Sequence, residues 1–282
     1  MLYSDVLLTV DFDRTLTAPD STIPQRNLEA IEYFMKNGGA FTVNTGRSVP
    51  MYRPQKDRVK VNVPLLLYNG SAALTQEGKL TNCAIIPTDP RAMIEDIQGR
   101  FPRLAVELQG EENHYLFQKD AMWEDYCDNN GCTWAYASLE DIPLPFLKLA
   151  LYEPFKANTV ASMYDATAED IAYFDEVAAY VEKRYEGIVE VFRAAPKIID
   201  IHAKGVSKAS AARWLQKALG RKILVCVGDA ENDLAMLRGA DYAFCPSDAI
   251  IAKEFSNVCP CAEGAVADVI YKKIPEILGI QP

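Results

Sequence analysis

The sequence has little histidine, no paired cysteine motif and no long apolar run. Its 282 residues include two histidines, His114 and His202, and seven cysteines that are scattered without a CxxC pair. An odd number of scattered cysteines is more typical of small apolar side chains in a reducing compartment than of a disulfide framework or a zinc site. The scarcity of histidine also argues against zinc chemistry and against a histidine base.

Acidic residues outnumber basic ones, and the sequence lacks a membrane-length apolar segment. The formal net charge is −10 at neutral pH. Because nucleic-acid backbones are bound mainly through lysine and arginine charge, we expect no nucleic-acid partner. No apolar run approaches the roughly 20 residues of a membrane span, and the first residues do not resemble a signal peptide. These absences predict a cytoplasmic protein that has no membrane partner and binds small molecules and metal cations.

The sequence is rich in apolar residues, which make up 49% of it and suffice for a substantial core. Its first part and its last part alternate strand and helix patterns. Predicted strands at 6–10, 40–43, 63–68 and 223–227 are apolar runs without polar alternation. Such runs are typical of parallel strands that helices cover on both faces. Predicted helices include 24–39, 207–220, which Ser207 would cap, and 266–278.

The middle of the chain has a different pattern. From residue 84 to residue 190 it reads as strands and helices with alternating apolar positions, for example Leu104, Val106 and Leu108. Alternation of this kind suggests antiparallel strands with one solvated face. We therefore predict a discontinuous α/β domain, 1–83 with 191–282, and an inserted α+β domain, 84–190.

Polar side chains follow several of the predicted strands. Asp11 and Asp13 come directly after the first strand, Thr45 after the second, and Asp229 and Asp233 after the strand at 223–227. Each motif alone also fits a polar turn or a helix start. In open α/β sheets, however, ligands bind beyond the carboxyl ends of the strands, so these segments should converge on one crevice. Two acidic motifs that each follow an apolar strand favour a site over coincidence.

Four motifs resemble, in order, those of the haloacid dehalogenase (HAD) superfamily, and specifically its Cof-type sugar-phosphatase-like branch: "DFDRT", "NTGR", "GVSK" and "GDAENDLAML". The resemblance covers the whole chain, because "LLLYNGSAAL" also matches that branch. It implies a Rossmann-like α/β core with a parallel sheet, and an α+β cap domain in the place of the middle insert. Two residues depart from the usual pattern: Arg14 stands where glycine is most often found, and Asn44 where a smaller residue is more usual.

The resemblance implies a Mg²⁺-dependent phosphatase that hydrolyses a small phosphorylated metabolite, with sugar phosphates first, through an aspartyl-phosphate intermediate. Enzymes that hydrolyse phosphate monoesters need up to about 10²¹-fold acceleration, whereas acid–base catalysis supplies about 10² to 10⁴. A carboxylate nucleophile divides one hard displacement into two. We assign this role to Asp11, and the acid–base role to Asp13. We expect Thr15 to cap the following turn.

The resemblance also implies a set of metal ligands. It assigns Mg²⁺ to Asp11, to the backbone carbonyl of Asp13 and to Asp229, which offer the hard oxygen ligands that this ion prefers. Asp233 would be an outer partner or a fourth ligand, or simply an acid favoured in the first turn of a helix. Asn232 would brace the phosphate or the catalytic lysine of the "GVSK" motif.

Further residues are expected to bind the transferred phosphoryl group. Lys208 would hold phosphoryl oxygens and keep Asp11 ionised through its opposite charge. Thr45 and the backbone N–H of Gly46 would donate hydrogen bonds to the same group. Arg47 fits two roles equally, binding of a second anionic group or a structural salt bridge.

Two alternative functions remain at this stage. A phosphomutase of the phosphomannomutase type would use the same aspartyl-phosphate and return it to the substrate, although "GDAENDLAML" resembles the phosphatase branch more closely. A phospho-accepting signalling module would bear its aspartate on the third strand of a much shorter chain, whereas Asp11 lies on the first strand. We expect a monomer or a small homo-oligomer.

Overall fold

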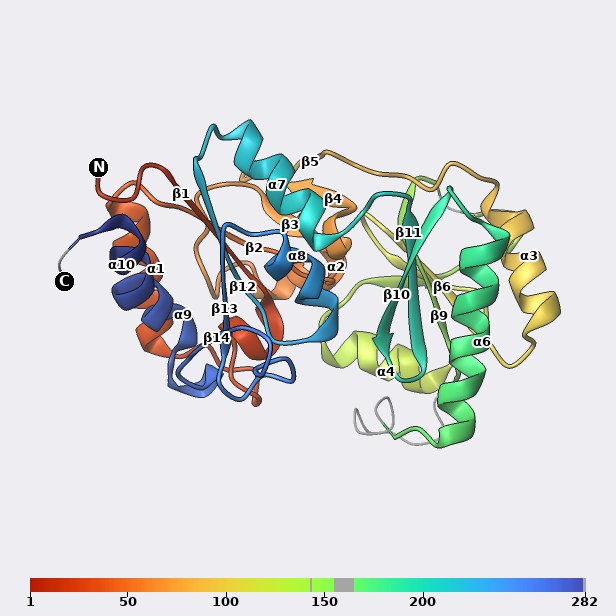
Figure 1. The fold of residues 1–282 in the computed structure, drawn as a ribbon. Helices are drawn as coiled ribbons and strands as arrows, with labels where there is room; N and C mark the ends of the chain where they lie inside the picture. The colour runs from red at the N-terminus through yellow and green to blue at the C-terminus, as the bar shows by residue number, and fades with distance from the viewer. Residues whose placement is uncertain (143, 155–164, 281–282) are drawn as a thin grey trace. The chain divides into compact units, whose positions relative to one another are not determined.

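The computed structural model describes residues 1–142, 144–154 and 165–280. The chain forms two compact units, shown in Figure 1. The first unit comprises Met1–Gly46, Lys56–Thr81 and Ser207–Pro282. The second unit comprises Arg47–Gln55 and Asn82–Val206. Each unit is therefore built from segments that are not contiguous in the sequence.

A five-stranded parallel sheet forms the centre of the first unit, in the order β14-β13-β12-β1-β2. The strands β1 and β2 are buried at every position, which explains their lack of polar alternation. The sheet confirms the predicted α/β class. The strands are β1 (Val6–Val10), β2 (Ala40–Val43), β12 (Ile223–Val227), β13 (Tyr242–Pro246) and β14 (Ser256–Val258).

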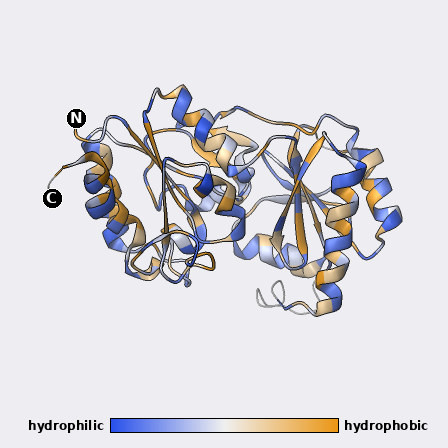
Figure 2. Cartoon of the chain, in the orientation of Figure 1, coloured by the Kyte–Doolittle hydropathy of each residue, from blue (hydrophilic) through white to orange (hydrophobic). Residues whose placement is uncertain are grey.

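Helices cover both faces of this sheet (Figure 1). One layer contains α1 (Gln25–Lys36), α9 (Ala265–Asp268), the π-helical turn η6 (Val269–Lys273) and α10 (Ile274–Leu278), and the other contains α7 (Lys208–Ala218) and α8 (Leu234–Arg238). Figure 2 shows hydrophobic residues along the strands and mixed hydropathy on the helices, as expected for helices that bury one face.

A second, smaller sheet of the first unit departs from the prediction for residues 63–68. β3 (Leu65–Leu67), β4 (Ala72–Leu74) and β5 (Leu80–Thr81) form an antiparallel sheet, and one bridge, Asn44 to Leu66, joins β3 to the end of β2 in parallel. β3 therefore keeps one parallel bridge to the end of β2, as expected, but its ladder is antiparallel and is formed with β4 instead of with the five-stranded sheet. The physical reason is the turn η3 (Tyr68–Gly70), whose three residues all have positive φ and reverse the chain.

The second unit contains a six-stranded sheet in the order β10-β11-β9-β6-β7-β8. All of its pairs are antiparallel except β7 with β8. Its strands are β6 (Ala105–Gly110), β7 (His114–Leu116), β8 (Trp134–Tyr136), β9 (Phe146–Tyr152), β10 (Val189–Ala195) and β11 (Ile198–Ala203).

Helices α3 (Pro90–Arg100) and α6 (Ala168–Arg184) cover one face of this sheet, and α4 (Ala121–Asn129) packs on the other (Figure 1). The short helix α2 (Val49–Tyr52) and the 3-10 turn η2 (Arg53–Gln55) complete the unit. Over the described parts of the chain, no helix combines the length and the hydropathy that crossing a bilayer requires.

The prediction of one solvated face on β6 is wrong. The apolar positions Val106 and Leu108 enter the core between the sheet and its two long helices. The alternate positions, Glu107 and Gln109, are also buried. Glu107 accepts a hydrogen bond of 2.9 Å from the indole N–H of Trp123 in α4. The alternation therefore separates an apolar face from a buried polar face.

The boundaries between the units differ from the predicted ones. The first, between residues 81 and 82, lies close to the predicted 83/84, but the second lies between residues 206 and 207 instead of 190/191. The reason is that β10 pairs with β11, and β11 pairs in turn with β9, so that both strands belong to the second sheet. The segment Arg47–Gln55 also belongs to the second unit, which the sequence pattern did not indicate.

Candidate functional site

The candidate site lies at the carboxyl ends of three adjacent strands of the first unit, β12, β1 and β2. Asp11 follows β1 directly, and its N–H donates to the carbonyl of Val227 at the end of β12 (2.9 Å). The N–H of Asn44, the residue after β2, donates to the carbonyl of Val10 (2.9 Å). Because these strands are parallel neighbours, the residues that follow them meet at one edge of the sheet.

Lys208 is a buried cation at the centre of the site. It is the first residue of α7, which begins with a capping box between Ser207 and Ser210. Its Nζ donates to Asp11 Oδ1 (2.6 Å) and to Asp233 Oδ1 (2.7 Å). Burial alone would lower the pKa of Lys208, but the two carboxylates outweigh it and raise that pKa. Lys208 is therefore charged at neutral pH.

Asp233 uses both of its carboxylate oxygens inside the protein. Oδ1 accepts from Lys208, while Oδ2 accepts from the backbone N–H groups of Asp229 (3.0 Å) and Ala230 (3.2 Å). It lies in the 3-10 turn η4 (Glu231–Asp233). A Cβ on Gly228 would lie 2.5 Å from Asp233 Cγ, so the glycine of "GDAEND" makes room for this carboxylate. Both oxygens of Asp233 are therefore engaged by Lys208 and by the backbone of the turn that carries Asp229.

Asp229 is held by a threonine from the first motif. Its Oδ1 accepts a hydrogen bond of 2.9 Å from Thr15 Oγ1. Burial, with the nearby charge of Asp233, raises the pKa of Asp229 to about 6. The expectation that Thr15 caps the following turn is wrong, because its hydroxyl donates to Asp229 and the N–H of Arg14 donates instead to Thr17 Oγ1 (3.1 Å).

The carboxylates of Asp11, Asp229 and Asp233 offer a set of oxygen ligands within 4.8 Å of one another. All three residues are buried, and burial raises the pKa of Asp11 well above its usual range although Lys208 opposes this. When ionised, three carboxylates against one ammonium leave an excess of two negative charges. Hard oxygen donors with this excess fit a divalent cation such as Mg²⁺.

Asp13 and Arg14 lie in the irregular turn η1 (Phe12–Leu16) that follows Asp11. Asp13 is partly exposed and has an extended backbone, with φ −80° and ψ 127°. Arg14 is exposed and has φ 60°, which is the left-handed region that favours glycine. Glycine, which the resemblance implies at this position, would adopt this φ without steric cost. The charge of Arg14 also lowers the pKa of Asp229.

Asn44, the second departure from the usual motif, braces the helix that carries Lys208. Its Nδ2 donates to the backbone carbonyl of Lys208 (2.9 Å), and its side chain is fully buried. This contact ties the end of β2 to the first turn of α7. No sequence pattern pointed to it, because the two residues lie far apart in the chain.

Thr45 and Gly46 follow Asn44 at the same edge. The N–H of the buried Thr45 donates to the carbonyl of Leu66 (2.9 Å), and its own carbonyl accepts from the N–H of Asn69 (3.0 Å). A Cβ on Gly46 would lie 2.8 Å from Asn69 Oδ1, so only glycine fits there without a shift. These contacts hold the loop that the sequence predicts to bind phosphate.

Two predicted binding residues are not joined to this cluster by the contacts described above. Arg47 is a partly exposed residue at the start of the segment Arg47–Gln55, which belongs to the second unit. Asn232 is partly exposed in η4 beside Asp233. Their roles stay predictions, and the observed bracing of Lys208 comes from Asn44 and Asp233.

A comparison of the sequence with models of protein families identifies the family of this chain. The model of the haloacid dehalogenase-like hydrolase family matches residues 8–268. The chain belongs to this family, which confirms the resemblance predicted from its four motifs. It is accordingly an enzyme of the hydrolase class.

Two curated relatives are named as phosphatases. The chain is 22% identical over 236 residues to 5-amino-6-(5-phospho-D-ribitylamino)uracil phosphatase YcsE of Bacillus subtilis, with 83% of this chain and 80% of that protein covered. It is 21% identical over 279 residues to pyridoxal phosphate phosphatase YbhA of Escherichia coli, with 95% and 98% covered.

Solved structures share the fold over almost the whole chain. A haloacid dehalogenase-like hydrolase from Bacteroides thetaiotaomicron has a TM-score of 0.77 at 20% identity, with 95% of this chain and 98% of that chain covered. The HAD subclass IIB sugar phosphatase BT4131 has a TM-score of 0.71 at 19% identity, with 98% and 99% covered. At these identities the likeness concerns the fold.

Proposed function

We propose that the protein is a Mg²⁺-dependent phosphatase that hydrolyses a small phosphorylated metabolite through an aspartyl-phosphate intermediate. Sugar phosphates are the leading substrate class in this proposal. The observation that carries the proposal is Lys208 Nζ, held between Asp11 and Asp233 beside Asp229. The names of the two curated relatives, both phosphatases of small phosphorylated compounds, support the substrate class.

Asp11 is the nucleophile in this proposal. Its carboxylate attacks phosphorus, and the bond to the leaving alcohol breaks, so that the phosphoryl group is transferred to Asp11 and later to water. The ion pair with Lys208 favours the ionised form of Asp11 against the effect of burial. Lys208 also supplies positive charge for the phosphoryl oxygens.

The residues fit a magnesium ion at the same edge. Asp11, Asp229 and the backbone carbonyl of Asp13 would hold it, and Asp233 would orient Lys208 and the turn that carries Asp229. When bound, Mg²⁺ supplies the positive charge that offsets the repulsion between the carboxylate nucleophile and the phosphate.

Asp13 is the proposed acid–base residue. It lies two residues after Asp11 in η1 and is partly exposed, so that its carboxyl group can exchange protons with a substrate and with water. It would protonate the leaving alcohol and then accept a proton from the hydrolytic water. Thr45 and the N–H of Gly46 would donate hydrogen bonds to the transferred group.

The two units have different roles in this proposal. Asp11, Lys208 and Asp229 all come from the first unit, which we assign as the catalytic core. We assign the second unit, Arg47–Gln55 with Asn82–Val206, as the cap that selects the leaving group.

Release of inorganic phosphate from a panel of phosphorylated metabolites tests the proposal. We expect release by the wild type with Mg²⁺, and release at background level with a chelator or in Asp11→Asn. Asp20→Asn, which changes an exposed carboxylate, is the matched control and should keep wild-type activity. Near wild-type turnover by a folded Asp11→Asn variant would refute the assignment of the nucleophile. Isomerised sugar monophosphate in place of free phosphate, with a bisphosphorylated sugar present, would indicate a phosphomutase.

A further inference from the structure

Three side chains that the sequence scatters meet in the interior of the second unit. A ring nitrogen of His114 and the sulfur atoms of Cys127 and Cys132 lie within 4.8 Å of one another. All three residues are at most 4% exposed. Thiolate and imidazole are the ligands that Zn²⁺ prefers in structural sites.

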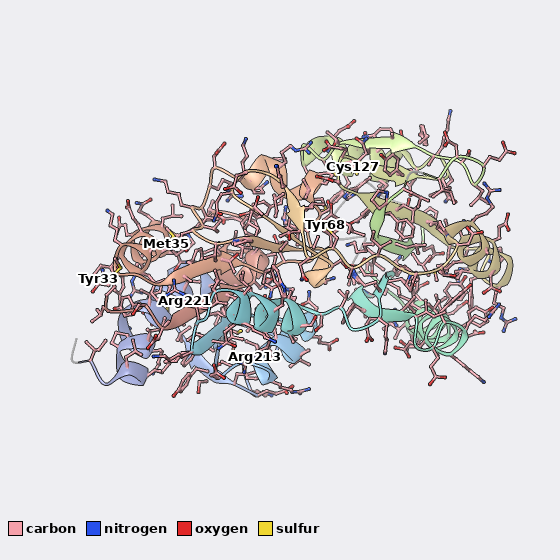
Figure 3. All side chains as sticks on the ribbon, turned by 90° about the horizontal axis from the view of Figure 1, so that it is seen from above. Tyr33, Met35, Tyr68, Cys127, Arg213 and Arg221 are labelled. Carbon is pink, nitrogen blue, oxygen red and sulfur yellow. The ribbon has the colours of Figure 1, made fainter. Side chains whose placement is uncertain are left out.

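The backbone around α4 fixes this meeting. Cys127 lies in the last turns of α4, and the N–H of Cys132 donates to its carbonyl (2.8 Å). Gly131, with φ 64°, permits the tight turn between them. β8 then pairs with β7, and the N–H of His114 donates to the carbonyl of Thr133 (2.9 Å). Figure 3 labels Cys127 among the side chains of this unit.

A carboxylate orients the histidine. His114 Nδ1 lies 2.5 Å from Glu107 Oε1, which also accepts from Trp123 Nε1 (2.9 Å). Glu107 Oε2 accepts from Gln109 Nε2 (2.9 Å). A metal-binding histidine usually donates its other ring N–H to such an anchored carboxylate. Glu107 therefore leaves Nε2 of His114 as the nitrogen that can bind a metal.

We propose that His114, Cys127 and Cys132 bind one Zn²⁺ ion. Ser48 Oγ lies 2.6 Å from His114 Nε2 and accepts a hydrogen bond from the N–H of Met51 (3.1 Å). On binding, Nε2 exchanges its contact with this hydroxyl for the metal, and the hydroxyl or a water molecule beside it fills the fourth position. Zinc–sulfur bonds of about 2.3 Å and zinc–nitrogen bonds of about 2.0 Å require the three ligand atoms to approach one another by up to about 1 Å.

The positive charge of the bound Zn²⁺ is balanced by the release of protons from its ligands. Each thiol loses its proton to solvent as its sulfur binds Zn²⁺, and Nε2 of His114 binds through its lone pair, so that any proton on it also leaves. No oxidant or reductant is needed. The site would fasten the turn after α4 to β7, and it shares no residue with the acidic cluster of the first unit.

Metal content and cobalt spectroscopy of the full chain test this site. We expect about one zinc per chain after purification under reducing conditions and dialysis, and a thiolate-to-cobalt charge-transfer band after exchange with Co²⁺. Cobalt bound at the carboxylates of the first unit gives no such band, so the two sites are distinguished. Cys127→Ser and Cys132→Ser should lose the charge-transfer band, whereas Cys245→Ser, a buried cysteine of the first unit, should keep it.

A folded and reduced wild type that takes up no zinc, measured by competition with a chromophoric chelator, would overturn the site. So would a charge-transfer band that survives in the double variant Cys127→Ser with Cys132→Ser. The wild-type titration does not depend on whether the variants fold. Since the readout is metal binding, it is also independent of phosphatase activity.

Discussion

Arg14 shows how one residue accommodates an unfavourable backbone beside the site. A non-glycine residue at φ 60° costs on the order of 1 kcal/mol, and Arg14 is exposed, so its side chain gains little from packing. The position of Arg14 also brings positive charge near Asp229. The backbone strain of Arg14 therefore destabilises the fold, whereas its charge favours the ionised form of Asp229.

Arg14→Gly should raise the free energy of unfolding by up to about 1 kcal/mol, because glycine adopts this φ without steric cost, although its freedom in the unfolded chain offsets part of the gain. Urea denaturation measures the change. Arg14→Ala is the matched control, since it removes the charge and keeps the Cβ. An equal gain from alanine would show that charge, and not φ, decides the effect.

Asp229 and Asp233 should respond differently to loss of charge. Asp233→Asn should lower activity by about 10-fold to 100-fold, as removal of an outer-shell partner does, with a smaller change in the Mg²⁺ concentration for half-maximal activity than in Asp229→Asn. The reason is that both oxygens of Asp233 already accept hydrogen bonds from the protein. A larger loss of Mg²⁺ affinity in Asp233→Asn than in Asp229→Asn would make Asp233 a direct ligand.

At the scale of residues, the sequence predicted which acids and which lysine to examine, and the structure brings Asp11, Lys208, Asp229 and Asp233 together. Motifs after apolar strands suffice for the acids, because the ends of parallel strands converge. Lys208 was indicated instead by the resemblance of "GVSK" to the family motif, since it begins a helix and follows no strand. The contact of Asn44 with the backbone of Lys208 could not be predicted, since it depends on how a strand end and a helix start meet in space.

At the scale of elements, continuous apolar strands were the most predictable. β1 and β2 have the predicted bounds, and α7 begins after Ser207 as expected. Short strands such as β8 were missed, because three residues carry too little periodicity. The pairing of β3 was also missed, since the turn that reverses the chain after it depends on positive φ at Tyr68 and Asn69.

Asp241 joins α7 to the strands beside it. Its carboxylate accepts from Arg213, which Figure 3 labels, at 2.9 Å and from the N–H of Leu224 at 2.7 Å. Burial alone would raise the pKa of Asp241, but these hydrogen bonds hold it below its usual value of 3.8. The carboxylate of Asp241 therefore binds a proton less tightly in the folded state than in the unfolded state.

Asp241→Asn should lower the free energy of unfolding by about 1–2 kcal/mol at pH 7, a value that allows for partial exposure of the carboxylate. The stabilisation is present above pH 3.8 and is lost as the pH falls through the lower folded pKa, so the difference from wild type should shrink in acid. Urea denaturation between about pH 3 and pH 7 measures it, with the exposed Asp57→Asn as control. A difference independent of pH would contradict this account.

At the scale of the whole molecule, each unit has its own buried charge pair. In the second unit, burial opposes the charge on His114, but Glu107 raises the pKa of His114 to about 9. The charged form of His114 therefore stabilises the folded state. This stabilisation is fully present at pH values below 6.5, the usual pKa, and is lost as the pH rises through about 9. Removing one partner of a buried pair costs about 3–5 kcal/mol.

Glu107→Gln should therefore destabilise the second unit selectively. In the presence of a chelator at neutral pH, we expect faster hydrogen exchange at backbone amides of Asn82–Val206, with strands β1 and β12 unchanged. Asp241→Asn is the matched control and should affect the first unit instead. Uniformly faster exchange in Glu107→Gln would show that the two units unfold together.

The division of the second unit into two separate segments of chain has a consequence for protein engineering. A chimera that exchanged Asn82–Val206 alone for the corresponding part of a relative would keep Arg47–Gln55 from this protein. Ser48 would then face a foreign side chain in place of His114, with which it makes a 2.6 Å hydrogen bond. A functional exchange of this module therefore requires both segments to be transplanted together.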